Sequence, residues 1–525
     1  MTLFPLFTVF FTISSFLVAA FLICRSSKNS QTQCTAPEAR GGWPIIGHLP
    51  LFFSKELFHK KLSTMVDVYG PVFTIWLGSV RTLVVSDPEV VRECFTVHDK
   101  VFLDRPVIAA TKILAYGGAM FGFSSYGNYW REMRKVVMSE LLSNYRLDRL
   151  RPMREKEVER AVSRLYKAWV ENNCPKQGVA VNMTDWFGDL MLQIALNMIG
   201  GKIYSIEDSG HERKEADKCK RLVRSWFSLF GVFVLSDAIP ILGWLDLGGY
   251  MKVMKQTKKD LDAMVTEWLE ERKRRRSSSC RPEDEEDFMD VMLGIAERGE
   301  ITDYDADTIV KATCLNMLVG GTDATTAALI WTLSLLVNHP QVMNKAREEV
   351  DRHVGKDRRA NESDIKNLVY LQAVVKESLR LYPPGPINGL RTSTEDCTLS
   401  NGCHIPAGTR LMINVWKMQR DERAWSNPND FNPERFLTYN RDSSLKPGQD
   451  FGLAPFSMGR RGCPGMSLAL YEMHLTIASL LQCFKLETPS GKPVDMTESA
   501  GLTNFKATPL HVVLVPRLEK KLYGF

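Results

Sequence analysis

The chain has 525 residues, of which 44% are hydrophobic and 24% charged, and its net charge is +6. This composition is typical of a globular protein, and so small a net charge gives no indication of nucleic-acid binding. Eleven cysteines are scattered along the chain without a CxxC pair. That pattern argues against a disulfide framework or a zinc site and fits a reducing compartment.

The first segment, residues 1–24, is almost wholly apolar from Leu3 to Ile23 and is followed by Arg25. A run of about 20 apolar residues is long enough to cross a bilayer, whereas the apolar core of a signal peptide has about 7–15. We therefore expect a membrane anchor, with a cleaved signal peptide as the less favoured alternative. Because the positive charge follows the run, the rest of the chain is expected to stay in the cytosol. Residues 25–48 are predicted to form a polar linker and hinge, and residues 49–525 one catalytic domain.

Two short β-like runs, 72–77 and 82–85, flank Gly78 and Ser79, and this pattern indicates a hairpin. Residues 100–128 are rich in aromatic residues and glycine without clear periodicity, and such a long irregular loop is usually functional. A helix is predicted to follow from Tyr129. It places Trp130 and Arg134 on one face, where both can donate hydrogen bonds to carboxylates.

A much longer helix is predicted from residues 302–305, which resemble a helix start, to Asn338, just before Pro340. At 1.5 Å per residue it would be about 50 Å long, enough to cross a whole domain. Gly320 and Gly321 lie in its middle, where each glycine costs about 1 kcal/mol relative to alanine. They also leave room for a ligand against the backbone.

Farther along, Glu377 and Arg380 are three residues apart on one helix face, and Arg435 supplies a second guanidinium. An acid between two guanidinium groups can join distant segments by bidentate hydrogen bonds.

The most specific pattern lies near the C-terminus and has the spacing Phe-x-x-Gly-x-Arg-x-Cys-x-Gly, met at Phe456, Gly459, Arg461, Cys463 and Gly465. The glycines allow a tight turn and a close approach to a flat cofactor. The charge of Arg461 and the N-terminus of the following helix both favour a thiolate. The pattern therefore favours a reactive thiolate at Cys463 over the alternative, a buried structural cysteine in a glycine-rich loop.

These motifs, in this order, resemble those of the cytochrome P-450 family along the whole chain. The phrases Tyr-Leu-Gln-Ala-Val-Val-Lys-Glu and Asn-Pro-Glu-Arg-Phe resemble the plant microsomal branch that oxidises alkaloids, flavones, coumarins and terpenoids. The resemblance implies one large, mainly α fold with a small β part, preceded by one transmembrane helix. It also implies a haem b whose thiolate ligand, Cys463, pushes electron density onto the iron.

The same resemblance assigns roles to further residues. Those that hold the haem are Cys463, Trp130, Arg134, Arg391, Arg461 and Phe456. Those that line the substrate pocket are Phe121, Gly320, Gly321, Ala324, Ile387, Leu390 and Leu502. Glu377, Arg380 and Arg435 become a buried structural triad.

The chain departs from the family pattern in the long helix. In relatives an acid and the next residue, a threonine, relay the protons that oxygen activation consumes. Here Asp323 matches the acid, but Ala324 replaces the threonine. Thr325 is the next hydroxyl, about 100° further round the helix, and we expect it to reach the iron only if the helix bulges. Asp323 and Thr325 are the catalytic candidates, with water or the substrate favoured to complete the relay.

The reaction implied is insertion of one oxygen atom from O₂ into a small hydrophobic or amphipathic substrate at the endoplasmic reticulum membrane. Electrons would come from an NADPH-dependent reductase that docks near Arg131, Lys135 and Arg460. Because Ala324 removes the usual hydroxyl, two alternatives remain: a haem-thiolate isomerase or dehydratase that needs neither O₂ nor reductase, and a haem-binding protein without turnover.

Overall fold

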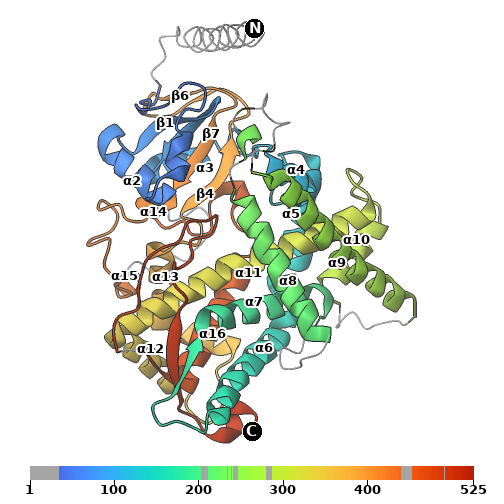
Figure 1. Cartoon of the computed structure of the whole chain (residues 1–525), viewed down its shortest axis with the longest axis vertical. Coiled ribbons are helices and arrows are strands. Elements are labelled where there is room, and N and C mark those ends of the chain that lie inside the picture. The colour runs from blue at the N-terminus through green and yellow to red at the C-terminus, as the bar shows by residue number, and fades with distance from the viewer. Residues whose placement is uncertain are drawn as a thin grey trace, which may run out of the picture.

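The computed structural model describes residues 35–525 apart from the stretches 203–210, 240–245, 279–285 and 439–451 and the positions 233, 238, 247 and 490. The predicted anchor, Leu3 to Ile23, lies outside the described residues. Within them, no helix is both long and apolar enough to cross a membrane. A larger helical part and a smaller sheet part make up the molecule (Figure 1).

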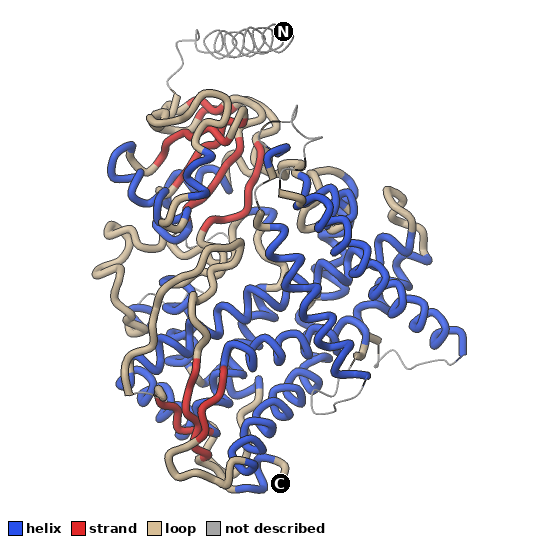
Figure 2. The backbone as a smooth tube through the Cα atoms, viewed as in Figure 1, coloured by secondary structure: helices blue, strands red, loops and turns tan. Residues whose placement is uncertain are grey.

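The main sheet has four strands in the order β1 (Val72–Leu77), β2 (Val80–Val85), β7 (Arg410–Asn414) and β4 (Ile387–Thr392). The first two form the antiparallel hairpin that the sequence predicts, and β2 pairs with β7 in parallel. Part of the predicted linker lies along this sheet, because Glu38 bridges to Thr74 of β1 and Gly47 to Leu77. The sheet is drawn in red near the N-terminal end of Figure 2.

Two smaller sheets complete the β part. One has the order β3 (Val179–Asn182), β9 (His511–Pro516), β8 (Phe484–Glu487), and the other pairs β5 (Cys397–Thr398) with β6 (His404–Ile405).

The helices supply most of the described chain, as the sequence predicts. They are α2 (Phe58–Tyr69), α3 (Pro88–Phe95), α4 (Ala109–Leu114), α5 (Asn128–Val136), α6 (Asn144–Glu171), α7 (Met183–Gly200), α8 (His211–Phe230), α9 (Tyr250–Ser278), α10 (Phe288–Glu297), α11 (Ala306–Asn338), α12 (Pro340–His353), α13 (Val369–Leu381), α14 (Val415–Met418), α15 (Arg435–Thr438) and α16 (Met466–Cys483).

The long helix α11 runs through the helical part and packs against α7, α10, α13 and α16 (Figure 1). It begins at Asp305, whose carboxylate accepts from the N–H of Thr308, and it ends before Pro340. A helix that is apolar on nearly all sides belongs in a core, and most of its side chains are buried. The backbone stays helical through Gly320 and Gly321, so the bulge considered from the sequence does not occur.

Candidate haem site

The loop before α16 holds Cys463 in a closed turn. A short 3-10 turn, η8 (Gly459–Arg461), leads into it, and the N–H of Cys463 donates to the carbonyl of Phe456 at 2.8 Å. Gly459 has φ +66°, and a Cβ atom at this position would collide with the carboxylate of Asp99. Glycine alone meets both conditions without strain.

The side chain of Cys463 is exposed, because it faces a cavity inside the protein, although protein atoms surround that cavity. Burial raises the pKa of Cys463, while the N–H of Gly465 and the charge of Arg134 act in the opposite direction. The sequence suggested Arg461 as the nearby charge, but the structure gives this role to Arg134, which also donates to the carbonyl of Gly462 at 2.7 Å. Burial thus opposes ionisation of the free thiol, and a metal ion at the sulfur would remove the proton.

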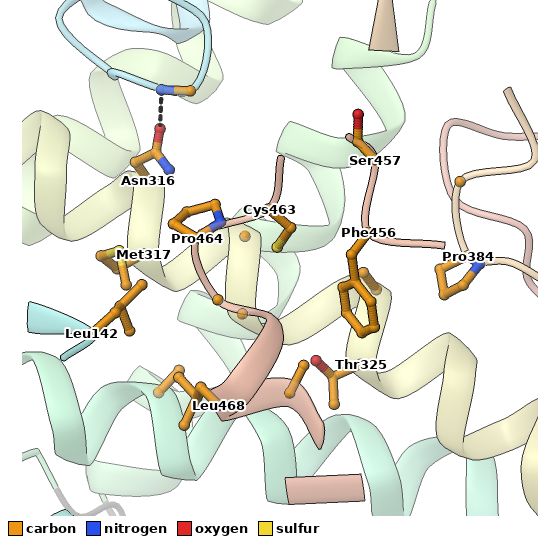
Figure 3. Close-up of a pocket in the computed structure, with 18 of the residues that line it drawn as sticks. Leu142, Asn316, Met317, Thr325, Pro384, Phe456, Ser457, Cys463, Pro464 and Leu468 are labelled. Atoms are coloured by element: carbon orange, nitrogen blue, oxygen red, sulfur yellow. Dashed lines mark hydrogen bonds between the residues drawn. The ribbon is translucent and has the colours of Figure 1, made fainter. Parts of the chain in front are cut away.

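A cavity of about 350 Å³ lies beside this sulfur, between the Cys463 loop, α16 and α11 (Figure 3). Its walls are mainly apolar, which is typical of cofactor and small-molecule sites of about 300–1,000 Å³. The apolar residues of the wall include Phe121, Leu142, Met198, Met317, Ala324, Pro384, Phe456 and Leu468.

Arginines gather at this cavity. Arg105, Arg134 and Arg461 line it together with Trp130, over whose ring the guanidinium of Arg461 lies at 4.5 Å from the centroid. Arg391 does not line it but donates to the carbonyl of Met458 in the Cys463 loop at 2.7 Å.

Burial lowers the pKa of Arg461 and of Arg391 to about 9, and the neighbouring guanidinium of Arg105 lowers both as well. Buried like charges are costly unless anions offset them, and guanidinium groups bind carboxylates in a bidentate manner. The cluster therefore fits the two carboxylates of a haem, and the thiol and the apolar walls fit its iron and its ring. Arg105 was missed in the sequence because it lies in an irregular loop without a motif.

The predicted pocket residues divide into two groups. Phe121, Gly320, Gly321 and Ala324 line the cavity, whereas Ile387 and Leu502 do not. The side chain of Leu390 lies outside what the structure describes.

The alternation of strand β4 explains the error at Ile387. Successive side chains of a strand point to opposite faces. Ile387 packs against the sheet core around Leu62 and Phe73, and Asn388 lines the cavity instead.

The acid and the hydroxyl of α11 lie in different surroundings. Ala324 and Thr325 line the Cys463 cavity, but Asp323 lines a second cavity of about 630 Å³ between α7, α8 and the loop 499–509. Leu502 also lines this second cavity. Burial raises the pKa of Asp323 to about 6, although the hydroxyl of Thr503 and the charge of Arg224 lower it.

The helix does not bulge at its glycines, and Thr325 nevertheless lines the Cys463 cavity. The expectation that Thr325 reaches the iron only through a bulge stays a prediction. Thr322, Thr326 and Thr332 donate to the carbonyl one turn earlier. Within the described residues, the hydroxyl of Thr325 makes no such bond and is free for another partner.

Glu377, Arg380 and Arg435 come together away from the cavity. The two oxygens of Glu377 accept from Arg380 at 2.7 and 2.8 Å, and one also accepts from Arg435 at 3.0 Å. Glu377 and Arg380 are fully buried. Arg380 also donates to the carbonyls of Gln419 and Pro428, so the group ties α13 to the segment that leads to the Cys463 loop.

The chain is similar to known proteins over nearly its whole length. The family model described as Cytochrome P450 matches residues 37–512. The chain is 48% identical to a flavonoid-6-hydroxylase of Ocimum basilicum over 97% of this chain and 96% of that protein. It is 47% identical to a strychnine-10-hydroxylase of Strychnos nux-vomica over 97% of both chains.

Among solved structures, a zebra fish cytochrome P450 with progesterone superposes with a TM-score of 0.71 at 26% identity, covering 87% of this chain and 99% of that chain. The matched family model, the near-complete coverage of plant hydroxylases and the shared fold agree with one another. The chain therefore belongs to the cytochrome P450 family and is an oxidoreductase of the monooxygenase class.

Proposed function

We propose that this enzyme inserts one oxygen atom from O₂ into a rigid, polycyclic, oxygen-bearing plant metabolite, with electrons supplied by NADPH through a reductase. The observation that carries this proposal is the position of Cys463 at the wall of an apolar cavity whose other wall is α11. The flavonoid and strychnine hydroxylases among the relatives support the substrate class, because flavonoids and strychnine are polycyclic, oxygen-bearing compounds.

Haem with a thiolate ligand supplies the oxygen-activating chemistry, and the protein binds, orients and controls water. In this proposal Cys463 would bind the haem iron through its sulfur, with Phe456 beside it. Trp130, Arg134 and Arg461, together with Arg105, would hold the propionates. Arg391 contributes indirectly, because it donates a hydrogen bond to the Cys463 loop.

Proton delivery is assigned to the wall formed by α11. The free hydroxyl of Thr325 can hold a water in the Cys463 cavity, while Asp323 draws protons from the second cavity on another side of the helix. Because Ala324 has no donor or acceptor, a polar group of the substrate can complete the chain of hydrogen bonds.

We also propose that Leu3–Ile23 anchors the protein in the endoplasmic reticulum membrane, with residues 25–48 as the linker and residues 49–525 as a cytosolic catalytic domain. The reductase is expected on the Cys463 side of the molecule. There Arg131, Lys135 and Arg460 offer positive charge, and about half of the Arg460 side chain is exposed.

The test is to incubate microsomes bearing this protein and a P450 reductase with pools of flavonoids, alkaloids and coumarins under ¹⁸O₂. A product that carries one ¹⁸O atom, with NADPH consumed, supports the proposal. Product formed without NADPH would show an isomerase or dehydratase instead, and haem binding without any product would show a carrier.

A further inference from the structure

The face of α11 that lines the Cys463 cavity is poor in polar groups. Within the described chain, Asn316 and Thr325 are its residues with side chains able to hydrogen-bond. The other lining residues of this helix are Met317, Gly320, Gly321, Ala324 and Ala328. Asn316 lies one turn before Gly320 and therefore on the same face. An amide in this apolar wall needs a partner, since an unsatisfied polar group away from water is costly.

The orientation of the Asn316 amide is fixed by the loop opposite. The backbone N–H of Gly122 donates to Oδ1 of Asn316 at 3.0 Å, the bond drawn dashed in Figure 3. A backbone N–H can only donate, so the atom that faces it must be the oxygen and not the nitrogen. A Cβ atom at Gly122 would lie 2.9 Å from this oxygen, so the close approach depends on the glycine.

The other end of the amide, Nδ2, is turned away from Gly122 (Figure 3). It carries two N–H donors, and within the described residues no carbonyl or side chain accepts from it. Asn316 is partly accessible, while its neighbours Leu315 and Leu318 are buried. The helix and the loop thus hold a donor at the cavity wall without using it themselves.

We propose that Nδ2 of Asn316 donates a hydrogen bond to an acceptor oxygen of the substrate, a carbonyl or an ether, and so fixes which edge of the substrate turns toward the haem. This inference rests on the proposed function and identifies the group on this chain that positions the substrate. It predicts that a polycyclic compound with such an oxygen is preferred over a hydrocarbon of the same shape.

Two variants separate the donor from the shape of the side chain. Asn316→Asp keeps an oxygen for the N–H of Gly122 but replaces the amide nitrogen by a second acceptor. Asn316→Leu removes all hydrogen bonding at similar volume. Met317→Leu is the matched control, because Met317 lines the same cavity and its thioether has no N–H or O–H to donate.

The experiment measures the dissociation constants of two probes, flavone and 2-phenylnaphthalene, from the shift of the haem absorption band in the full-length, haem-loaded protein. The second probe has nearly the shape of the first and lacks its oxygens. We expect Asn316→Leu to weaken flavone about tenfold and to leave 2-phenylnaphthalene within about twofold. Asn316→Asp should weaken flavone at least as much, and Met317→Leu should change the two probes in parallel.

Equal weakening of both probes by Asn316→Leu would overturn the proposal, since Asn316 would then only shape the cavity. Equal affinity of the unaltered protein for the two probes, or no binding of flavone, would also overturn it. Failure of the proposed function is a separate result, seen as the absence of a thiolate-type carbon monoxide band or of ¹⁸O in any product. If either Asn316 variant does not load haem, the other one decides the question.

Discussion

The two walls of the Cys463 cavity are built in different ways. On one wall, the loop 456–465 is held by its own backbone turn and by Arg134 and Arg391, which donate to two of its carbonyls. On the other wall, α11 presents a regular helix face in which Gly320, Gly321 and Ala324 offer no functional side-chain group. One wall is a densely bonded loop, and the other is a smooth surface with few polar groups.

This difference shows how far neighbours in sequence remain neighbours in space. In the loop, the backbone turns back on itself, so that the N–H of Cys463 donates to the carbonyl of Phe456, seven residues earlier. In a helix, each residue turns by about 100°, so Asp323 and Thr325 diverge by about 200° and lie in different cavities. Substitutions in the two walls should therefore differ in effect, and the largest effect is expected at Cys463.

Cys463→Ser should abolish the site. A serine hydroxyl does not supply the thiolate that the axial position requires. The carbon monoxide difference band of a thiolate-ligated haem should disappear, together with product formation. Cys174→Ser is the control, because Cys174 is an exposed cysteine away from this loop and should leave the band unchanged. A Cys463→Ser protein that keeps the band would contradict the assignment of the loop.

Glu377→Ala should lower the free energy of unfolding by about 3–5 kcal/mol, because it leaves the buried guanidinium of Arg380 without its carboxylate. We expect little folded, haem-loaded protein and a lower midpoint of thermal unfolding. Glu89→Ala is the control, since its ion pair with Arg92 is mostly exposed and should contribute at most about 1 kcal/mol. A well-loaded Glu377→Ala protein that fails only in turnover would indicate a catalytic role.

Asp323→Asn tests the helix wall through pH. Burial raises the pKa of Asp323 to about 6, above the value of about 3.9 for an unfolded aspartate. The free energy of unfolding of the unaltered protein therefore falls as the pH rises from about 3.9 to about 6, because the buried carboxyl group must then carry a charge. The asparagine of the variant does not titrate. The free energy of unfolding of Asp323→Asn, relative to the unaltered protein, should increase by about 1–2 kcal/mol from about pH 5 to pH 8. Denaturant titrations at the two pH values measure it, and a decrease would show that Asp323 is stabilised as a carboxylate.

The smallest effect is expected at Thr325 and Ala324. Thr325→Ala removes the free hydroxyl from the cavity and should lower the fraction of NADPH coupled to product severalfold, whereas Thr325→Ser should keep it. Ala324→Thr adds a hydroxyl on the same wall and should raise coupling on poor substrates. Product and hydrogen peroxide per NADPH are the measurements. Unchanged coupling in Thr325→Ala would leave water or the substrate as the relay.

Much of the fold was predictable because its signals are local. The hairpin of β1 and β2 follows from alternation around Gly78 and Ser79, and α11 follows from an acidic start and a proline stop. The Cys463 loop was readable for the same reason, since all its residues lie within ten positions of the chain.

The sequence by itself was therefore enough to single out Cys463, the loop that carries it and the mainly helical fold class. Each of these depends on residues close together in the chain. Only the tertiary structure decided that Arg105 joins the cations at the cavity, that Asn388 and not Ile387 lines it, and that Asp323 turns to a second cavity. It also placed Asn316 against Gly122, 194 positions apart. Such contacts depend on how a helix is rotated and which loop packs against it, and packing between distant segments sets both.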